Sequence, residues 1–166
     1  MSVITSHPTR RHDSHPVALV VSLVAVGIVA GVGGLASADA SSTYRELQQP
    51  SWAPPTWLFG PVWGVLYVVI AVAAWLVWRA NPTFANPAIR VYVIQLILNL
   101  AWSPLFFGAN MRGWALVDIL LLDVAVVVTI ALMWTQRKIA AVMLLPYLAW
   151  ILFATALNYS IWSLNS

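Results

Sequence analysis

The chain has 166 residues, of which 61% are apolar and 8% charged, and its mean hydropathy is +0.85. The polar side chains are too few to cover the surface of a soluble globular protein. The sequence therefore predicts an integral membrane protein. The absence of cysteine excludes disulfides and thiolate chemistry, and the net charge of +3 comes from scattered residues that predict no nucleic-acid partner.

The first 16 residues are polar and carry three histidines, and we expect residues 1–16 to form a disordered tail. The histidines have no neighbouring ligands, so we predict no metal site there. The apolar run that follows, residues 17–38, is too long for a signal peptide and predicts a retained membrane helix. Gly27 and Gly31 within it have the GxxxG spacing that lets two helices approach closely.

The next segment, residues 39–60, is a long loop rich in proline and tryptophan, which we interpret as a lid over a binding site. The alternative is that its tryptophans anchor the protein at the membrane interface. Four further apolar runs, each long enough to cross a hydrocarbon layer of about 30 Å, predict helices over residues 61–78, 88–107, 112–134 and 139–162. The predicted fold is therefore an all-α integral membrane protein, with a five-helix transmembrane bundle over residues 17–162 and a short C-terminal tail at 163–166.

Five spans would place the two termini on opposite sides of the membrane. Six basic residues would lie on the N-terminal side and two on the other, namely Arg10, Arg11, Arg79, Arg90, Arg137 and Lys138 against Arg45 and Arg112. By the positive-inside rule, this distribution predicts a cytoplasmic N-terminus and places the long loop on the opposite side.

Polar and aromatic residues inside the spans are costly in lipid, so they are expected to face the bundle interior. In the third predicted helix, Gln95, Asn99 and Trp102 share one face. Comparable faces of the other helices carry Trp63 and Tyr67, Trp114 and Asp118, and Trp150, Ala154, Leu157 and Asn158. Counting along the spans places all of them in the leaflet next to the long loop, which predicts an enclosed pocket. Structural polar packing between helices is the alternative.

A pocket with tryptophan walls, a few amides and one carboxyl suits a large, flat and mainly apolar ligand. Asp118 and Asp123 would permit a proton or ion relay, although a hydrogen bond to a neighbouring helix is the simpler interpretation. Pro146 frees a backbone carbonyl and predicts a kink that widens the cavity. The sequence contains no evident pairing of a nucleophile with a base, which speaks against a hydrolase.

Three stretches of the chain resemble the signature segments of the tryptophan-rich sensory protein and translocator protein family, TspO/MBR. They read WAPPTWLFGPVWGVLY, NLAWSPLFFGANMRGWALVD and LPYLAWILFATALNYSIW. The resemblance covers residues 44–162. It implies a five-helix protein of the lipid bilayer, usually a homodimer, that binds porphyrins such as protoporphyrin IX and haem, sterols, and synthetic benzodiazepine-site ligands.

Matched by motif, the resemblance implies a pocket lined by Trp63, Asn99, Trp102, Trp114, Asp118, Trp150, Ala154 and Leu157, with Pro54, Trp57 and Phe59 from the lid. Several bacterial members are associated with light-dependent porphyrin breakdown, which the resemblance assigns here to Trp63 and Trp150. The cholesterol motif of eukaryotic members requires a basic residue shortly after Tyr159. Residues 160–166 contain none, which speaks against specific cholesterol transport.

We therefore predict a membrane receptor or carrier for tetrapyrroles and related apolar ligands, with a role in sensing, transport or disposal and no required cofactor. Trp63 and Trp150 would stack on the macrocycle, Asn99 would donate a hydrogen bond, and the lid would gate access. Two other functions stay open. One is a light-dependent porphyrin-degrading enzyme, and the other is a membrane scaffold whose GxxxG helix recruits partners.

Overall fold

The computed structural model describes residues 16–36 and 40–166, and the regular structure in these ranges is helical. The elements are α1 (Pro16–Ala36), α2 (Ala40–Glu46), a 3₁₀ turn η1 (Thr56–Leu58), α3 (Phe59–Ala80), α4 (Pro87–Ser103), a π-helical turn η2 (Pro104–Gly108), α5 (Arg112–Gln136), α6 (Lys138–Met143) and α7 (Leu145–Leu164). The predictions for the histidine-bearing residues 1–15 and for residues 37–39 lie outside the described residues.

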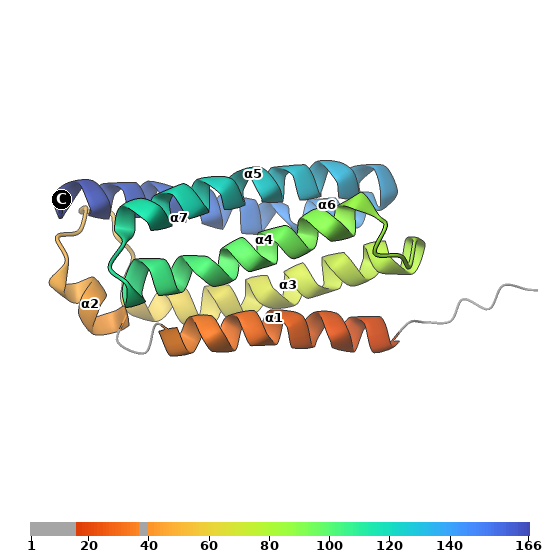
Figure 1. Cartoon of the computed structure of the whole chain (residues 1–166), viewed down its shortest axis with the longest axis horizontal. Helices are drawn as coiled ribbons and strands as arrows, with labels where there is room; N and C mark the ends of the chain where they lie inside the picture. Colours follow the sequence, from red (N-terminus) through yellow and green to blue (C-terminus); the bar gives the residue numbers. More distant parts are fainter. Residues whose placement is uncertain (1–15, 37–39) are drawn as a thin grey trace, which may run out of the picture.

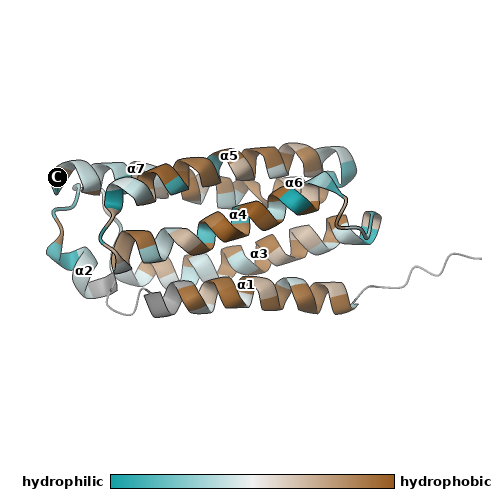
Figure 2. Cartoon of the chain, in the orientation of Figure 1, coloured by the Kyte–Doolittle hydropathy of each residue, from teal (hydrophilic) through white to brown (hydrophobic). Residues whose placement is uncertain are grey.

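Four helical segments are long and apolar enough to cross a membrane: Thr56–Ala80, Pro87–Gly108, Arg112–Gln136 and Lys138–Leu164. At 1.5 Å per residue, each matches a hydrocarbon layer of about 30 Å. Figure 2 shows hydrophobic residues along the middle of the long helices and many hydrophilic ones near their ends. The prediction of an all-α, multi-pass integral membrane protein is therefore confirmed.

The long helices run side by side in alternating directions (Figure 1). α4 packs along α5, α1 along α3, and α5 along α7. We call the end that carries α2 and the C-terminus the lid end. We call the opposite end, where α3 leads to α4 and α5 leads to α6, the basic end, because Arg79, Arg90, Arg137 and Lys138 lie there.

At the basic end, α4 begins with a side-chain cap. The Oδ1 atom of Asn86 accepts a hydrogen bond from the Ala88 amide at 3.0 Å, and Pro87 occupies the first helical position, where its missing N–H costs nothing. The amides of Asn86 and Gln136 also bond to each other in both directions, at 2.8 and 3.0 Å. Asn86 is only 2% exposed, so its side-chain amide needs partners inside the protein. The pair with Gln136 provides them and links the start of α4 to the end of α5.

Two prolines lie at interruptions of the helices, and only the interruption near Pro146 was predicted from the sequence. Pro104 has no N–H to continue the α4 ladder, and the chain widens into η2, where the Ala109 amide bonds to the Pro104 carbonyl at 2.8 Å. The fifth predicted helix is divided at Leu144 into α6 and α7, two residues before Pro146. The prolines thus locate the irregularities that a hydropathy pattern alone does not show.

The predicted lid contains regular structure that its composition did not predict. α2 occupies residues Ala40–Glu46, and its Tyr44 is buried, with a hydroxyl that donates to the Pro54 carbonyl at 3.3 Å. Burial raises the pKa of Tyr44, because desolvation disfavours the charged phenolate. Further along, Gln48 and Asn165 exchange two hydrogen bonds of 3.0 Å. The segment is thereby tied to the end of α7.

Candidate functional site: an aromatic cavity at the lid end

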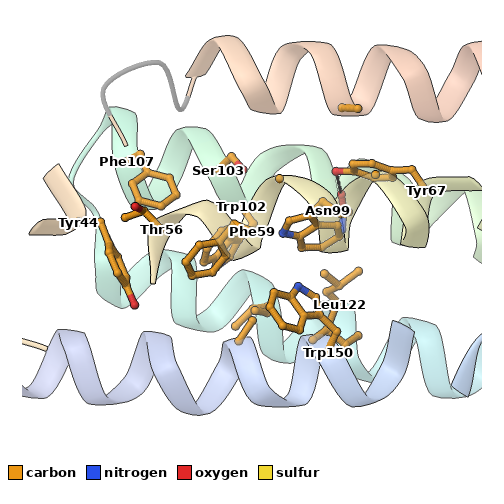
Figure 3. Close-up of a pocket in the computed structure, with 17 residues that line it drawn as sticks. Tyr44, Thr56, Phe59, Tyr67, Asn99, Trp102, Ser103, Phe107, Leu122 and Trp150 are labelled. Carbon is orange, nitrogen blue, oxygen red and sulfur yellow. Dashed lines mark hydrogen bonds between the residues drawn. The ribbon is translucent and has the colours of Figure 1, made fainter. Parts of the chain in front are cut away.

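A cavity of about 470 Å³ lies inside the lid end of the bundle (Figure 3). Its lining residues come from α1, α2, η1, α3, α4, η2, α5 and α7: Ala30, Tyr44, Thr56, Phe59, Gly60, Trp63, Gly64, Tyr67, Asn99, Trp102, Ser103, Phe107, Ile119, Leu122, Trp150, Ile151 and Ala154. Pockets for small organic ligands have volumes of about 300 to 1,000 Å³. The cavity is therefore large enough to be a ligand site.

Aromatic rings from three long helices form much of the cavity wall. On α3, Trp63 stacks against Tyr67 with 5.3 Å between ring centroids. Phe59 meets Trp150 of α7 in an edge-on contact with 6.0 Å between ring centroids, and Trp102 of α4 also lines the cavity (Figure 3). Such walls favour a flat aromatic ligand, because its ring system can make offset-stacked or edge-to-face contacts with several side chains at once.

A chain of hydrogen bonds runs from the cavity wall into the bundle core. The Tyr67 hydroxyl donates to Asn99 Oδ1 at 2.9 Å, and Asn99 Nδ2 donates to the Tyr147 hydroxyl at 3.2 Å. The Tyr147 hydroxyl in turn donates to Gln95 Oε1 at 2.8 Å. Both ends of the Asn99 amide are thus occupied by protein groups. The Nδ2 group carries two N–H bonds, so Asn99 holds Tyr147 with one of them and keeps the other for a ligand in the cavity.

The indole nitrogens of two cavity tryptophans differ in their partners. The Nε1 atom of Trp102 donates to Asn158 Oδ1 at 3.0 Å, and Asn158 Nδ2 donates to the Arg112 carbonyl at 3.0 Å, which joins α4, α7 and α5. The Nε1 atom of Trp150 is buried without a hydrogen-bond partner. Figure 3 shows this nitrogen turned toward the cavity. A buried donor without a partner is costly, so a ligand acceptor at this position would be favoured.

Six of the eleven sequence-predicted site residues line the cavity: Phe59, Trp63, Asn99, Trp102, Trp150 and Ala154. The other five lie outside its lining: Pro54, Trp57, Trp114, Asp118 and Leu157. Trp57 and Trp114 are 70% and 64% exposed on the outer surface. Leu157 is buried in a separate cluster with Tyr44, and the Pro54 carbonyl accepts from that tyrosine.

The two aspartates of α5 are buried beside the cavity and do not line it. Asp123 Oδ2 accepts a hydrogen bond from the Thr155 hydroxyl at 2.9 Å, which is the bond to a neighbouring helix that the sequence suggested. Asp123 Oδ1 and Asp118 Oδ2 have no hydrogen-bond partner. Across residues 16–36 and 40–166, no three histidine or carboxylate side chains gather as metal ligands would.

The cavity also includes residues that the sequence-based site omitted. Tyr67 lies one turn after Trp63 and was assigned to the same face, and Phe107 lies four residues after Ser103, so helical spacing could have found both. Ile119 and Leu122 come from the cavity face of α5, which their apolar character does not distinguish from a lipid face. Ala30 of α1 has no sequence signal, because its position depends on how α1 packs against α3.

A comparison with known protein families identifies the family of the chain. The model of the TspO/MBR family matches residues 18–163, which is most of the chain. The chain belongs to the TspO/MBR family. The resemblance of the three signature segments is therefore confirmed, and it extends over all the long helices of this TspO/MBR protein.

Individual relatives of this TspO/MBR protein come from distant organisms. The human translocator protein is 46% identical over 125 residues, 74% of each chain. The tryptophan-rich protein TspO of Archaeoglobus fulgidus is 40% identical over 149 residues, 89% of this chain and 97% of the relative. Protein CrtK of Rhodobacter capsulatus is 32% identical over 147 residues, 87% of this chain and 91% of the relative.

Proposed function

We propose that this protein is a membrane receptor or carrier that binds tetrapyrroles, such as protoporphyrin IX and haem, in the aromatic cavity. The observation that carries the proposal is the wall of Trp63, Trp102 and Trp150, which three helices contribute to one cavity. A tetrapyrrole is broad, flat and mainly apolar, so it gains from stacking on several rings at once. Relatives named translocator protein support a role in transport, and sensing or disposal stay alternatives.

The polar groups of the cavity support the same ligand class. A tetrapyrrole carries carboxylate side chains, and the unpartnered Trp150 Nε1 offers a donor to one carboxylate oxygen. The Tyr67–Asn99–Tyr147 chain holds the opposite wall rigid, which lowers the ordering cost of binding. The remaining lining is largely apolar, with the hydroxyls of Thr56 and Ser103 as its further polar groups, so most of the macrocycle would meet apolar side chains.

The test is a titration of the purified chain with protoporphyrin IX, followed by tryptophan fluorescence. Trp150→Phe removes the donor and part of the ring, and we expect at least a tenfold loss of affinity, corresponding to about 1.4 kcal/mol. Trp114→Phe is the matched control, because Trp114 lies on the outer surface away from the cavity. Equal affinity of the wild type and the Trp150→Phe, Trp63→Phe double variant would remove the proposed site.

A second function, light-dependent breakdown of the bound porphyrin, is favoured by one observation: Trp63 and Trp150 both border the space that the macrocycle would occupy. Excited porphyrin and molecular oxygen could then react within contact distance of the indoles. The measurement is the decay of the porphyrin absorbance under illumination in air. Decay at the same rate with wild type and with the Trp63→Phe, Trp150→Phe variant, at equal bound porphyrin, would eliminate this activity.

We infer that α1 is a fifth span beside the four longer segments. It has 21 residues, about 32 Å at 1.5 Å per residue, and it runs along α3 (Figure 1). Arg79, Arg90, Arg137 and Lys138 at the basic end support a cytoplasmic location for that end, with the lid end outside. Labelling single introduced cysteines at Thr83 and Gln48 with a membrane-impermeant maleimide tests this, because only the Gln48→Cys site should react in intact cells.

We also infer a homodimer formed through α1. Gly27 and Gly31 lie on the exposed side of this helix, and a Cβ atom added at either position would meet nothing within 4 Å in the monomer. A second copy could therefore approach this face closely. Gly27→Leu with Gly31→Leu should shift the protein from dimer to monomer in detergent, measured by light scattering. An unchanged mass would contradict this interface, and loss of a cellular phenotype with intact porphyrin binding would favour the scaffold role.

A further inference from the structure

A second hollow lies on the outer surface of the lid end, separate from the aromatic cavity. It is a groove of about 640 Å³ between the start of α5 and the end of α7. Its residues include Arg112 and Trp114 of α5 and Trp162 of α7, with none in common with the lining of the cavity. The groove is therefore a candidate site independent of tetrapyrrole binding.

Arg112 is the only charged side chain among the residues that line the groove. Its Nη2 atom donates to Asn110 Oδ1 at 3.0 Å, and its Nε atom is buried without a hydrogen-bond partner. Asn110 has a φ of 55°, a left-handed conformation that asparagine tolerates and that forms the turn leading into α5. Asn110 thus holds the guanidinium at the rim of the groove through one N–H, and an anion there would bind the other N–H groups of the two terminal nitrogens.

Two indoles flank this cation at the level of the helix ends. Trp114 is 64% exposed and Trp162 is 41% exposed. A Cβ atom at Gly113 would lie 3.4 Å from Trp162 Nε1, so the α5 backbone rests directly against this ring and holds it in place. Exposed tryptophans beside a cation are typical of the headgroup layer of a membrane.

Below the indoles, the groove continues as an apolar strip on α5. Val117 and Leu120 are 47% and 49% exposed. Leu120 follows Arg112 by eight residues, which is about 12 Å along the helix axis. A cation, an aromatic rim and an apolar strip therefore follow one another from the membrane surface into the hydrocarbon layer.

We propose that this groove binds a membrane phospholipid, with its phosphodiester at Arg112 and an acyl chain along Val117 and Leu120. The guanidinium fork matches two phosphate oxygens, and the lipid leaflet supplies the ligand at high local concentration. A free phosphate would use only Arg112 and leave the apolar strip uncovered, whereas a phospholipid covers both. The site is occupied from the leaflet at the lid end, whichever ligand fills the cavity.

The experiment uses the full chain in detergent, titrated with dioleoylphosphatidylglycerol and analysed by native mass spectrometry. We expect Arg112→Gln to weaken lipid binding about tenfold, because it removes charge-assisted hydrogen bonds to the phosphate. Lys138→Gln, at the basic end, is the matched control and should bind as the wild type does. Arg112→Lys keeps the charge without the fork and should give an intermediate loss, so the result does not depend on one variant.

Two further probes distinguish a phospholipid site from a site for a neutral lipid or for a free phosphate. Dioleoylglycerol has the same acyl chains without a phosphate, and it should bind the wild type at least tenfold more weakly. Glycerol 1-phosphate, the soluble headgroup, should fail to displace the lipid at millimolar concentration. The proposal is overturned if dioleoylglycerol binds equally well, if Lys138→Gln loses as much affinity as Arg112→Gln, or if glycerol 1-phosphate empties the site.

Discussion

At the basic end, the Asn86 and Gln136 amides bond to each other in both directions, and Ala88, Ala140 and Ala141 are completely buried around Met133. At the lid end, the same helices carry bulky rings, and the Trp150 indole nitrogen is buried without a partner. Small side chains let the helices meet closely and fill the interior. Rings facing Gly60, Gly64 and Ala154 instead leave a cavity.

The two ends therefore have different tasks. The basic end contributes stability, because its polar groups are satisfied inside the protein and its alanines leave little free volume. The lid end is packed less closely. Its Trp150 Nε1 donor and its aromatic rings are available to a ligand. Substitutions at the basic end should therefore change the free energy of unfolding most, and substitutions at the lid end should change ligand binding most.

The largest expected loss of stability is at the basic end, in Asn86→Ala. This change removes the α4 cap, worth about 1 kcal/mol, and leaves the Gln136 amide without its partner, worth about another 1 to 2 kcal/mol. The free energy of unfolding, measured by titration with sodium dodecyl sulfate in mixed micelles, should fall by the sum. Gln136→Ala keeps the cap and should lose only the contribution of the amide pair, about 1 to 2 kcal/mol, so equal losses in the two variants would contradict the role of the cap.

A second pair of variants makes the same enlargement, alanine to leucine, at each of the two ends. Ala141→Leu inserts three carbon atoms where no space exists, and we expect it to cost about 2 kcal/mol of stability. Ala154→Leu inserts the same atoms beside the cavity, and we expect a change below about 1 kcal/mol. Protoporphyrin IX should bind to Ala141→Leu normally and to Ala154→Leu at least tenfold more weakly, measured by tryptophan fluorescence. The reverse pattern would break the distinction between the ends.

The smallest expected losses of stability come from two variants that distinguish a core residue, Tyr147, from a residue of the cavity wall, Tyr67. Tyr147→Phe leaves both Asn99 Nδ2 and Gln95 Oε1 without their shared partner, whereas Tyr67→Phe frees only Asn99 Oδ1 at the cavity wall. Hydrogen bonds between membrane helices contribute about 0.6 kcal/mol on average, so we expect losses of about 1 and about 0.5 kcal/mol, respectively. Unfolding in mixed micelles measures both, and a larger loss for Tyr67→Phe would reverse the assignment of Tyr147 as the centre of the chain.

Helical periodicity and span counting predicted a substantial part of the candidate site. Trp63, Asn99, Trp102 and Trp150 were placed at one depth because each lies a countable number of residues from a helix end, and all four line the cavity. The same method was less informative for α5. Trp114 and Asp118 are one turn apart, yet Trp114 is 64% exposed and Asp118 is buried outside the cavity lining.

Helix rotation explains the difference. A span that is apolar on all sides gives no strong signal for its inward face, and α5 carries exposed Leu120 and Leu121 beside buried Ile119 and Leu122. Its rotation is decided by packing against α4 and α7. That packing turns Ile119 and Leu122 into the cavity and Trp114 to the outer surface, which a count along the sequence cannot foresee.

Composition and local pattern by themselves determined the membrane environment, the approximate spans, the irregularity near Pro146, and the family. These follow from the free energy of transfer into lipid and from backbone sterics, which act on each residue within a few positions of its own place in the chain. Only the tertiary structure decided which indole nitrogen lacks a partner, which face of α5 meets the cavity, and that Arg112 and Trp162 form one groove. Those properties depend on contacts between residues far apart in the chain, which exist only after the helices have packed.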